Sequence, residues 1–295
     1  MTNGSKVTNE GLRIFLNRMF KEIPDYTAPS RFAVGIGTAT SQATDTDLDI
    51  KVPMSGTESV DDCETANWTD SADMTSSLNS TTFKEGLNAL NLTKDGASST
   101  IAYVEKTTAS LDFTDKELSV WIYIKDTATL NKLGSSEAIK INFGSDSSNN
   151  YEWITPKANL SVGWNLITKL TSNNPDVING SPIITACDYT KITLLSVNSA
   201  DTWVDGDIVM DDIKLASFDD FPKIFVSGYP ILDETNLQVT FRCFLNTLEA
   251  NGYDISEMGL FNTDSSPKIY SRAVFTPLNK SETVEISFVQ KDKLV

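Results

Sequence analysis

Three aromatic residues in the middle of the chain have amide or carboxylate side chains near them in the sequence. A sugar-binding site needs an exposed aromatic ring with hydrogen-bonding groups beside it. The candidates for glycan binding are therefore Tyr151 and Trp153, which adjoin Asn149 and Asn150, and Trp203, which lies between Asp201 and Asp205. The alternative is that all three aromatic side chains belong to a hydrophobic core.

The composition argues against catalysis. The chain has no histidine, which excludes Ser-His-Asp and Cys-His nucleophilic systems and His-ligated zinc or iron sites. Acidic residues are plentiful, but no pair stands out by its spacing as the two carboxylates of a glycosidase. We therefore expect a protein without enzyme activity. Cys63, Cys187 and Cys243 are far apart and form no CxxC motif, so we expect free thiols in a protein made in a reducing cytoplasm.

The charge of the chain limits its partners. The net charge is -16 and the isoelectric point is about 4.4, so the chain lacks the basic face that nucleic acids and anionic membrane surfaces require. No stretch approaches the 18 or so apolar residues of a membrane-spanning helix. The first residues are polar and do not resemble a secretory signal peptide. We expect no nucleic-acid partner and no membrane partner.

The sequence predicts a β-sandwich in the middle of the chain. Leu118–Lys125 alternates apolar residues on both faces, which is typical of a strand that is covered on both sides. Short strand patterns separated by polar turns predict a sandwich or jelly roll. The predicted strands cover residues 89–92, 101–105, 118–125, 138–143, 151–154, 164–170, 191–197 and 207–215.

The two chain ends differ from this block and are each too small to fold alone. A helix is predicted over residues 8–22, and alternating strands are predicted after residue 222. We therefore predict a mostly β protein in which a sandwich of residues 58–218 is inserted into a small α+β domain of residues 1–57 and 219–295. Gly35 and Gly37 do not start a helix pattern, so we expect a turn with positive φ rather than a phosphate loop.

The predicted helix has an apolar stripe at helical spacing, made of Leu12, Phe15, Leu16, Met19 and Phe20. The simplest interpretation is that this stripe faces the core of the domain. The alternative is that it contacts a partner subunit.

The middle block resembles carbohydrate-binding-module-like jelly rolls. The matching residues are Asp61–Glu64 with Trp68 close behind, Leu118–Tyr123, Gly163–Asn165 and the closing Met210–Leu215. The resemblance implies a structural calcium between the first and last strands, for which Asp62, Glu64, Asp211 and Asp212 are the candidate ligands. Calcium prefers six to eight hard oxygen ligands, which carboxylates provide. The alternative is a group of solvated acidic residues without an ion.

The chain ends resemble a module of tailed-phage virion proteins. The matching features are the helix with Gly11 and Leu12, the strand Phe32–Gly37, Asp45–Leu48, and Asn251–Phe261 followed by Arg272 and Lys280. The resemblance implies a non-enzymatic virion structural protein that displays the sandwich, with other virion proteins and further copies of itself as partners. The candidate assembly residues are Leu12, Phe15, Met19, Gly259, Leu260 and Phe261. The alternative is a receptor-binding adhesin or tail-fibre protein whose sandwich recognises host glycans.

Overall fold

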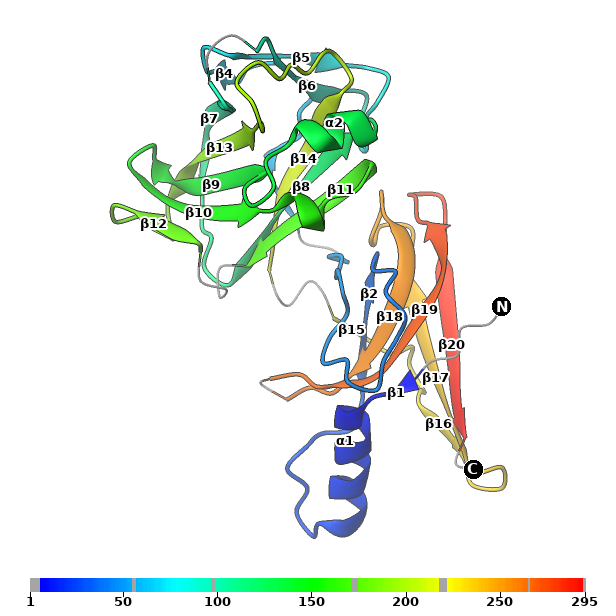
Figure 1. The fold of residues 1–295 in the computed structure, drawn as a ribbon. Coiled ribbons are helices and arrows are strands. Elements are labelled where there is room, and N and C mark those ends of the chain that lie inside the picture. The colour runs from blue at the N-terminus through cyan, green and yellow to red at the C-terminus, as the bar shows by residue number, and fades with distance from the viewer. Residues whose placement is uncertain are drawn as a thin grey trace. The chain divides into compact units, whose positions relative to one another are not determined.

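The structure is a computed structural model that describes residues 6–54, 57–96, 99–170, 175–217, 222–264 and 266–293. The chain divides into two compact units, which are described separately below (Figure 1). Unit 1 contains Met1–Gly56 and Phe218–Val295, and unit 2 contains Thr57–Ser217. Residues 55–56 and 218–221, next to the predicted boundaries, lie outside the described residues. The predicted mostly β class is confirmed.

Unit 2 is a β-sandwich of two antiparallel sheets (Figure 1). One sheet has the strand order β12-β10-β9-β13-β7-β4, and the other has the order β11-β8-β14-β6-β5 with β3 also paired to β14. The elements are β3 (Glu58–Asp61), β4 (Thr69–Asp70), β5 (Met74–Asn79), β6 (Ala89–Lys94), β7 (Ile101–Leu111), β8 (Lys116–Ile124), α2 (Thr127–Lys132), β9 (Ile139–Asp146), β10 (Asn149–Thr155), the 3₁₀ turn η1 (Lys157–Asn159), β11 (Gly163–Leu170), β12 (Val177–Asn179), β13 (Cys187–Leu195) and β14 (Ile208–Ser217).

Strand β8 is covered on both faces, as its sequence predicts. Its inward side chains Val120, Ile122 and Ile124 are fully buried in the core between the sheets. On its other face Trp121 is also buried, and its ring contacts Trp164 edge-on at 6.3 Å. Strand β8 pairs with β14, so the two apolar stretches that dominate the sequence of the middle block lie side by side.

Unit 1 is built from both ends of the chain. Its larger sheet has the order β1-β19-β18-β2-β15, and its smaller sheet has the order β16-β17-β20. The elements are β1 (Lys6–Val7), α1 (Asn9–Phe20), β2 (Arg31–Gly35), β15 (Lys223–Ile224), β16 (Ile231–Asp233), β17 (Gln238–Leu245), β18 (Asp254–Phe261), β19 (Ile269–Asn279) and β20 (Ile286–Lys293). Because β1 and β2 pair with β19 and β18, neither chain end forms this sheet alone.

Helix α1 begins after Thr8, whose hydroxyl accepts a hydrogen bond from Gly11 N at 2.9 Å. A Cβ at Gly11 would lie 2.1 Å from the carbonyl oxygen of Tyr270, so the helix approaches β19 closely at this point. Within α1, which is described throughout, the buried residues are Gly11 and Ile14. Neither α1 nor α2 has the length and apolar character to cross a lipid bilayer, as far as the chain is described.

The expectation that the apolar stripe of α1 faces the core is wrong. Its members are exposed, with fractions that include 53% for Leu16 and 77% for Phe20. The physical reason is the close contact at Gly11, which turns the side of the helix carrying Ile14 toward the sheet. The stripe therefore lies beside the buried side rather than on it.

The expectation that Gly35 and Gly37 form a turn with positive φ is also wrong, because neither has a positive φ. Both instead make room for the carboxylate of Glu257, since a Cβ at either glycine would lie 2.5 Å from Glu257 Oε1. Glu257 is fully buried and forms an ion pair with the buried Arg272 at 2.9 Å. A buried charge is tolerated because it is paired and hydrogen-bonded.

The predicted assembly residues of β18 belong to the interior of unit 1. Leu260 and Phe261 have exposed fractions of 0% and 4%. A Cβ at Gly259 would come within 2.8 to 3.0 Å of the side chains of Phe261, Ile269 and Leu48, so this glycine permits close packing. Of the two alternatives for Leu260 and Phe261, docking into the core or into a neighbouring subunit, the described contacts fit the first.

Candidate functional site

The outward side of one sheet of unit 2 carries a continuous group of polar and tyrosine side chains. Ile192 and Leu194 of β13 point into the core, so alternation turns Lys191 and Thr193 outward. In the neighbouring strands β7, β9 and β10, the residues between the core residues also face outward. We call this group the polar face; its residues are Tyr103 and Glu105 of β7, Tyr189, Lys191 and Thr193 of β13, Lys140 and Asn142 of β9, and Asn150 and Glu152 of β10.

The centre of the polar face is a row that crosses four strands. Lys191 is the register partner of both Glu105 and Asn142, and Asn142 is the partner of Glu152. Neighbouring strands are about 4.8 Å apart, so the row from Glu105 to Glu152 is about 14 Å long. Charged and amide groups therefore follow one another in a line across the sheet.

Two tyrosines are held in place at the β7 side of this row. The hydroxyl of Tyr189 donates a hydrogen bond to Glu105 Oε2 at 2.6 Å. Lys191 Nζ lies 4.4 Å from the centre of the Tyr103 ring, which is a cation–π distance. Burial, and after it the neighbouring Glu105 carboxylate, raise the pKa of Tyr189, so its phenol stays neutral and acts as a donor.

The β10 side of the row is an amide and carboxylate network. Glu152 accepts hydrogen bonds from Asn142 Nδ2 at 3.1 Å and from Lys140 Nζ at 3.2 Å. Burial opposes the charge of Lys140, but its hydrogen bonds to Glu137 and Glu152 prevail and raise its pKa. The side chains of Lys140 and Glu152 keep 22% and 17% of their surface exposed, so a ligand can reach them.

The polar face carries several kinds of hydrogen-bonding group. It offers ammonium and phenol donors, carboxylate acceptors and a tyrosine ring, and a molecule with many hydroxyl groups can use all of these. Glycosidases hold their two carboxyl groups roughly 5 to 9.5 Å apart, and the backbone positions of Glu105 and Glu152 are separated by three strand spacings, about 14 Å.

The structure does not place the predicted aromatic platforms on the surface. Trp153 is 4% exposed and packs edge-on against Phe113 with ring centres 5.8 Å apart. Tyr151 is half-buried against the same core. Both point inward because the alternation of β10 gives the outward positions to Asn150 and Glu152. Trp153 is thus a core residue, as the alternative interpretation proposed.

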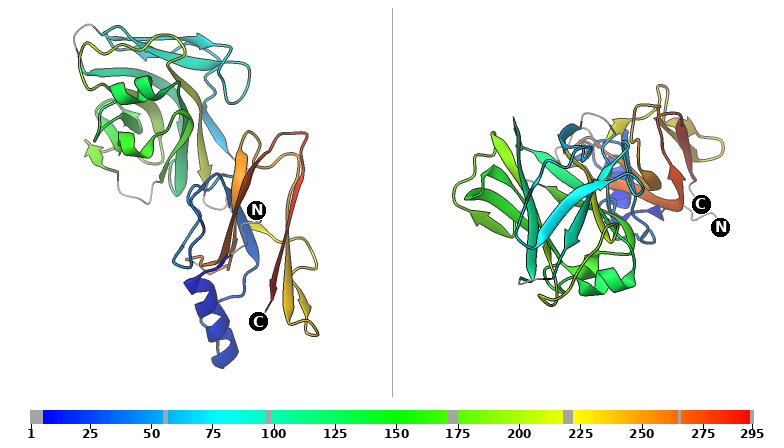
Figure 2. Two further views of the ribbon diagram at one scale, coloured as in Figure 1. Left: turned by 45° about the vertical axis from the view of Figure 1, so that its right-hand side comes forward. Right: turned by 90° about the horizontal axis from the view of Figure 1, so that it is seen from above.

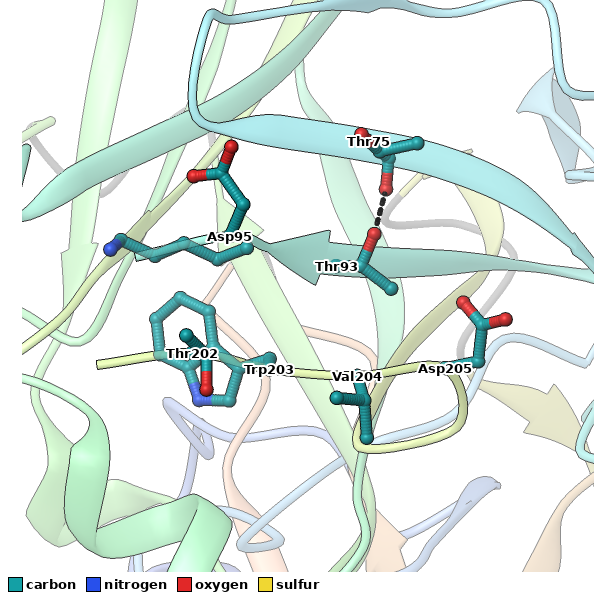
Figure 3. A pocket seen from close by; sticks show the side chains of 8 residues that line it. Thr75, Thr93, Asp95, Thr202, Trp203, Val204 and Asp205 are labelled. Carbon is teal, nitrogen blue, oxygen red and sulfur yellow. Dashed lines mark hydrogen bonds between the residues drawn. The ribbon is translucent and has the colours of Figure 1, made fainter. Parts of the chain in front are cut away.

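Trp203 is 1% exposed and forms part of the wall of a hollow of about 580 Å³ (Figure 3). Its backbone pairs with Lys94, through hydrogen bonds of 3.0 and 3.1 Å. Figure 3 shows Thr75 and Thr93 on one side of the hollow, joined by a hydrogen bond of 2.8 Å, and Val204 and Asp205 on the other. Threonine and aspartate side chains contribute to the lining of the hollow, but the Trp203 ring is too deeply buried to stack on a sugar, so its predicted platform role is wrong.

The four predicted calcium ligands are used in other ways. Glu64 accepts hydrogen bonds from Leu87 N at 2.6 Å and from Asn88 N at 3.2 Å. The Asp212 carboxylate pairs with Lys214 at 2.8 Å. Asp62 accepts a hydrogen bond from Glu64 N at 3.2 Å.

Asp211 offers the feature that best suits a cation. It is fully buried, and its Oδ1 has no hydrogen-bond partner among the described residues. Its Oδ2 accepts hydrogen bonds from Lys84 N at 2.6 Å and Glu85 N at 3.1 Å. Within the described part of the chain, no three His, Cys, Asp or Glu side chains are grouped as a metal site, so the predicted set does not fit calcium as it stands. Calcium at these residues stays a prediction.

Comparisons with known proteins concern the sandwich. No protein-family model matches the chain, and no curated protein matches it. A family 11 carbohydrate-binding module from Clostridium thermocellum, in complex with a mixed-linked tetrasaccharide, is similar in structure at 16% identity, covers 55% of this chain and 96% of its own, and has a TM-score of 0.36. The CBM22-2 xylan-binding domain from Paenibacillus barcinonensis is similar at 14% identity, covers 55% and 98%, and has a TM-score of 0.31.

Similarity at this level supports no inference about binding in this chain. The assignment of unit 2 as a β-sandwich rests on its own two sheets and the core between them.

Sequence reasoning missed the residues of the polar face, although a signal for them was present. In residues 101–105, Ala102 and Val104 alternate with Tyr103 and Glu105, and this alternation assigns the tyrosine and the carboxylate to one face. The pairing of β7 with β13 joins residues 76 to 94 positions apart, and a single sequence does not contain that register. The amide of Asn150, which the sequence places beside Tyr151 and Trp153, belongs to the opposite side of β10 from these two rings.

Proposed function

We propose that this chain is a non-enzymatic glycan-binding protein whose polar face binds an oligosaccharide. The observation that carries the proposal is the row Glu105–Lys191–Asn142–Glu152, with Tyr103 and Tyr189 beside it. The row is long enough to contact more than one sugar unit, and its donors and acceptors are fixed by neighbours before a ligand arrives. Such preorganisation lowers the entropy that binding costs.

The test is binding of the full chain to a glycan array, followed by calorimetry with the glycans that bind. Tyr103→Ala removes the ring that lies under Lys191, and we expect it to weaken binding by about tenfold or more. Tyr123→Ala is the matched control, because Tyr123 is also half-buried but lies on the outward side of the other sheet. Equal binding by wild type and Tyr103→Ala, or no glycan bound at all, would contradict the proposal.

Absence of catalysis is part of the same proposal. The separation of Glu105 and Glu152 and the lack of histidine support it. The glycan that binds best is incubated with the protein, and its products are followed by mass spectrometry. Release of a shorter sugar that is lost when Glu105 or Glu152 is replaced would identify a glycosidase and contradict the proposed absence of catalysis.

We also propose that unit 1 attaches the chain to a phage particle, so that the sandwich is displayed on a virion. This part rests on the resemblance of the chain ends to virion proteins. Phe261→Asp places a charge in the interior of unit 1, which is costly unless the charge is paired, and should prevent incorporation. The test complements a phage that lacks the gene and blots purified particles for the protein. Incorporation at the normal level would contradict this assignment of unit 1.

The second candidate function is that of an adhesin or tail-fibre protein, in which glycan recognition attaches the particle to its host. The position of the polar face on the outward side of its sheet, where Lys140 and Glu152 keep 22% and 17% of their side-chain surface exposed, favours this candidate. It is distinguished by adding the purified protein, or its Tyr103→Ala variant, to host cells before infection. Protection by wild type and not by Tyr103→Ala would support the adhesin, and infection at the normal rate would contradict it.

A further inference from the structure

A lysine and an asparagine of unit 1 meet where strands β18 and β19 end their pairing. The two strands run antiparallel and side by side (Figure 2). Asn251 lies shortly before β18, and Lys280 directly follows β19. Backbone hydrogen bonds of 2.9 Å, from Gly252 N to Lys280 O and from Lys280 N to Tyr253 O, hold the two segments together. The two side chains are therefore kept close by the backbone around them.

The ammonium group of Lys280 is buried, with an exposed fraction of 0% for the residue. Its Nζ donates hydrogen bonds to Asn251 Oδ1 at 2.6 Å and to Ser281 O at 2.9 Å. Both acceptors are uncharged, so they offset only part of the cost of burying the charge. Burial lowers the pKa of Lys280, although the charges of Glu249 and Glu285 oppose this shift. A larger share of this amine is therefore neutral and nucleophilic than in an exposed lysine.

The side-chain amide of Asn251 is held in a fixed orientation. Its Nδ2 donates a hydrogen bond of 2.8 Å to Thr247 O, which directs Oδ1 toward Lys280. A C=O bond is about 1.2 Å long, so Nζ of Lys280 lies within about 3.8 Å of the amide carbon Cγ. Reacting atoms held about 3 to 3.5 Å apart react faster because of their proximity. A small movement of the Lys280 side chain therefore brings the amine to the amide carbon.

We propose that Lys280 and Asn251 form an isopeptide bond. Nζ of Lys280 attacks Cγ of Asn251, the Cγ–Nδ2 bond breaks, and two protons of the Lys280 ammonium group pass to Nδ2. A secondary amide forms and ammonium leaves, so atoms and charge balance without an oxidant or a further reactant. The new bond closes a covalent ring over residues 251–280, which includes β18 and β19. Because β18 also pairs with β2, the bond fixes the strand on which both chain ends of unit 1 assemble.

The test is the mass of the purified full chain, kept in mildly alkaline buffer until its mass is constant. We expect a mass below that of the sequence by one ammonia molecule. Attack of Gly252 N on Asn251 would form a succinimide with the same loss, so a tryptic digest must locate the bond. Trypsin cleaves after lysine and arginine, so the isopeptide predicts a branched peptide in which residues 243–268 are joined to residues 273–291.

Lys280→Arg separates the isopeptide from a succinimide. The guanidinium group keeps the positive charge and the hydrogen-bond donors, but it stays protonated and does not attack an amide. This variant should have the full mass of its sequence. Lys268→Arg, which replaces another lysine of unit 1, is the matched control and should still lose ammonia.

A wild-type chain of full mass, or an ammonia loss that persists in Lys280→Arg, would overturn the proposal. If Lys280→Arg does not fold, the wild-type digest decides the question, because cleavage after Lys280 and the lack of the branched peptide would also overturn it. Neither a glycan nor a phage particle enters this test, so the isopeptide and the proposed function can fail separately.

Discussion

The backbone amide of Gly37 donates a hydrogen bond of 3.0 Å to the carboxylate of Glu257, which lies 220 residues further along the chain. The same carboxylate accepts hydrogen bonds from the amides of Asp49 and Ile50 at 3.2 and 3.0 Å. Arg272 completes the shell and also pairs with Asp45 and Asp49. One buried side chain therefore joins the N-terminal and C-terminal parts of unit 1.

Replacing Glu257 with glutamine should destabilise unit 1. The amide keeps the shape of the side chain but removes the fully buried one of the three carboxylates that pair with Arg272, and breaking a buried ion pair costs about 3 to 5 kcal/mol. All five tryptophans lie in unit 2, at positions 68, 121, 153, 164 and 203, so tryptophan fluorescence follows unit 2 alone. In urea, we expect Glu257→Gln to shift the transition seen by circular dichroism to lower concentration and to leave the fluorescence transition in place.

The control for this prediction is Glu285→Gln, which changes an exposed glutamate of unit 1 by the same atoms. It should leave both transitions unchanged. An unaltered circular dichroism transition in Glu257→Gln would show that the buried carboxylate does not hold the two chain ends together.

The segment of residues 57–217 should fold without the rest of the chain. It has a core of its own, and its first and last strands, β3 and β14, are hydrogen-bonded neighbours, so removal of unit 1 leaves no strand unpaired within the segment. We expect the isolated segment to melt cooperatively and to keep the fluorescence spectrum that it has in the full chain. A soluble segment with no cooperative transition would contradict the independence of the sandwich.

The stability of unit 2 should fall as the pH rises through neutrality. Burial raises the pKa of Asp212 to about 7, with Lys214 opposing this effect and Glu85 adding to it. Burial also raises the pKa of Asp211 to about 6. Because the folded state binds these protons more tightly than the unfolded state, their contribution is complete below the unfolded pKa of about 4 and is lost as the pH rises through about 6 to 7.

Asp212→Asn removes one of these groups and should reduce the pH dependence. The backbone φ of Asp212 is 50°, a conformation that asparagine tolerates, so the substitution adds no backbone strain. Urea midpoints measured by fluorescence from about pH 5 to about pH 8 provide the test. Asp205→Asn, at an exposed aspartate, is the control. Equal slopes in wild type and Asp212→Asn would show that Asp212 is not protonated in the folded state.

If calcium binds at Asp211, it should stabilise unit 2 by mass action, since the ion binds the folded form. We expect a chelator to lower the melting temperature and added calcium to restore it. Asp211→Asn should abolish this response, because it neutralises the buried carboxylate whose Oδ1 has no partner among the described residues. Identical melting curves with chelator and with calcium, in protein shown to be free of metal, would show that calcium does not bind and stabilise this chain.

The sequence pattern predicted where the strands lie better than it predicted which side of each element is buried. The strands β8 and β14 are evident from alternating Val, Ile and Leu, and helix α1 is evident from its apolar residues at helical spacing. Strand β5 was missed because Met74–Asn79 is mostly Ser, Thr and Asn, and its pairing with β6 determines it. The buried side of α1 depends on the contact between Gly11 and Tyr270, which are 259 positions apart. The polar face likewise depends on the register of β7 with β13.

The pairing of β3 with β14 has a consequence for how such a protein can change. Glu58 and Leu215 are register partners, so the sandwich begins and ends at two backbone positions about 5 Å apart. The two ends of a loop in the surrounding domain can therefore stay about as close together with the sandwich inserted as in a hairpin. The insertion then costs the surrounding domain little loop-closure entropy. Another folded domain whose two ends are neighbours should therefore be able to replace unit 2 as an insertion in unit 1.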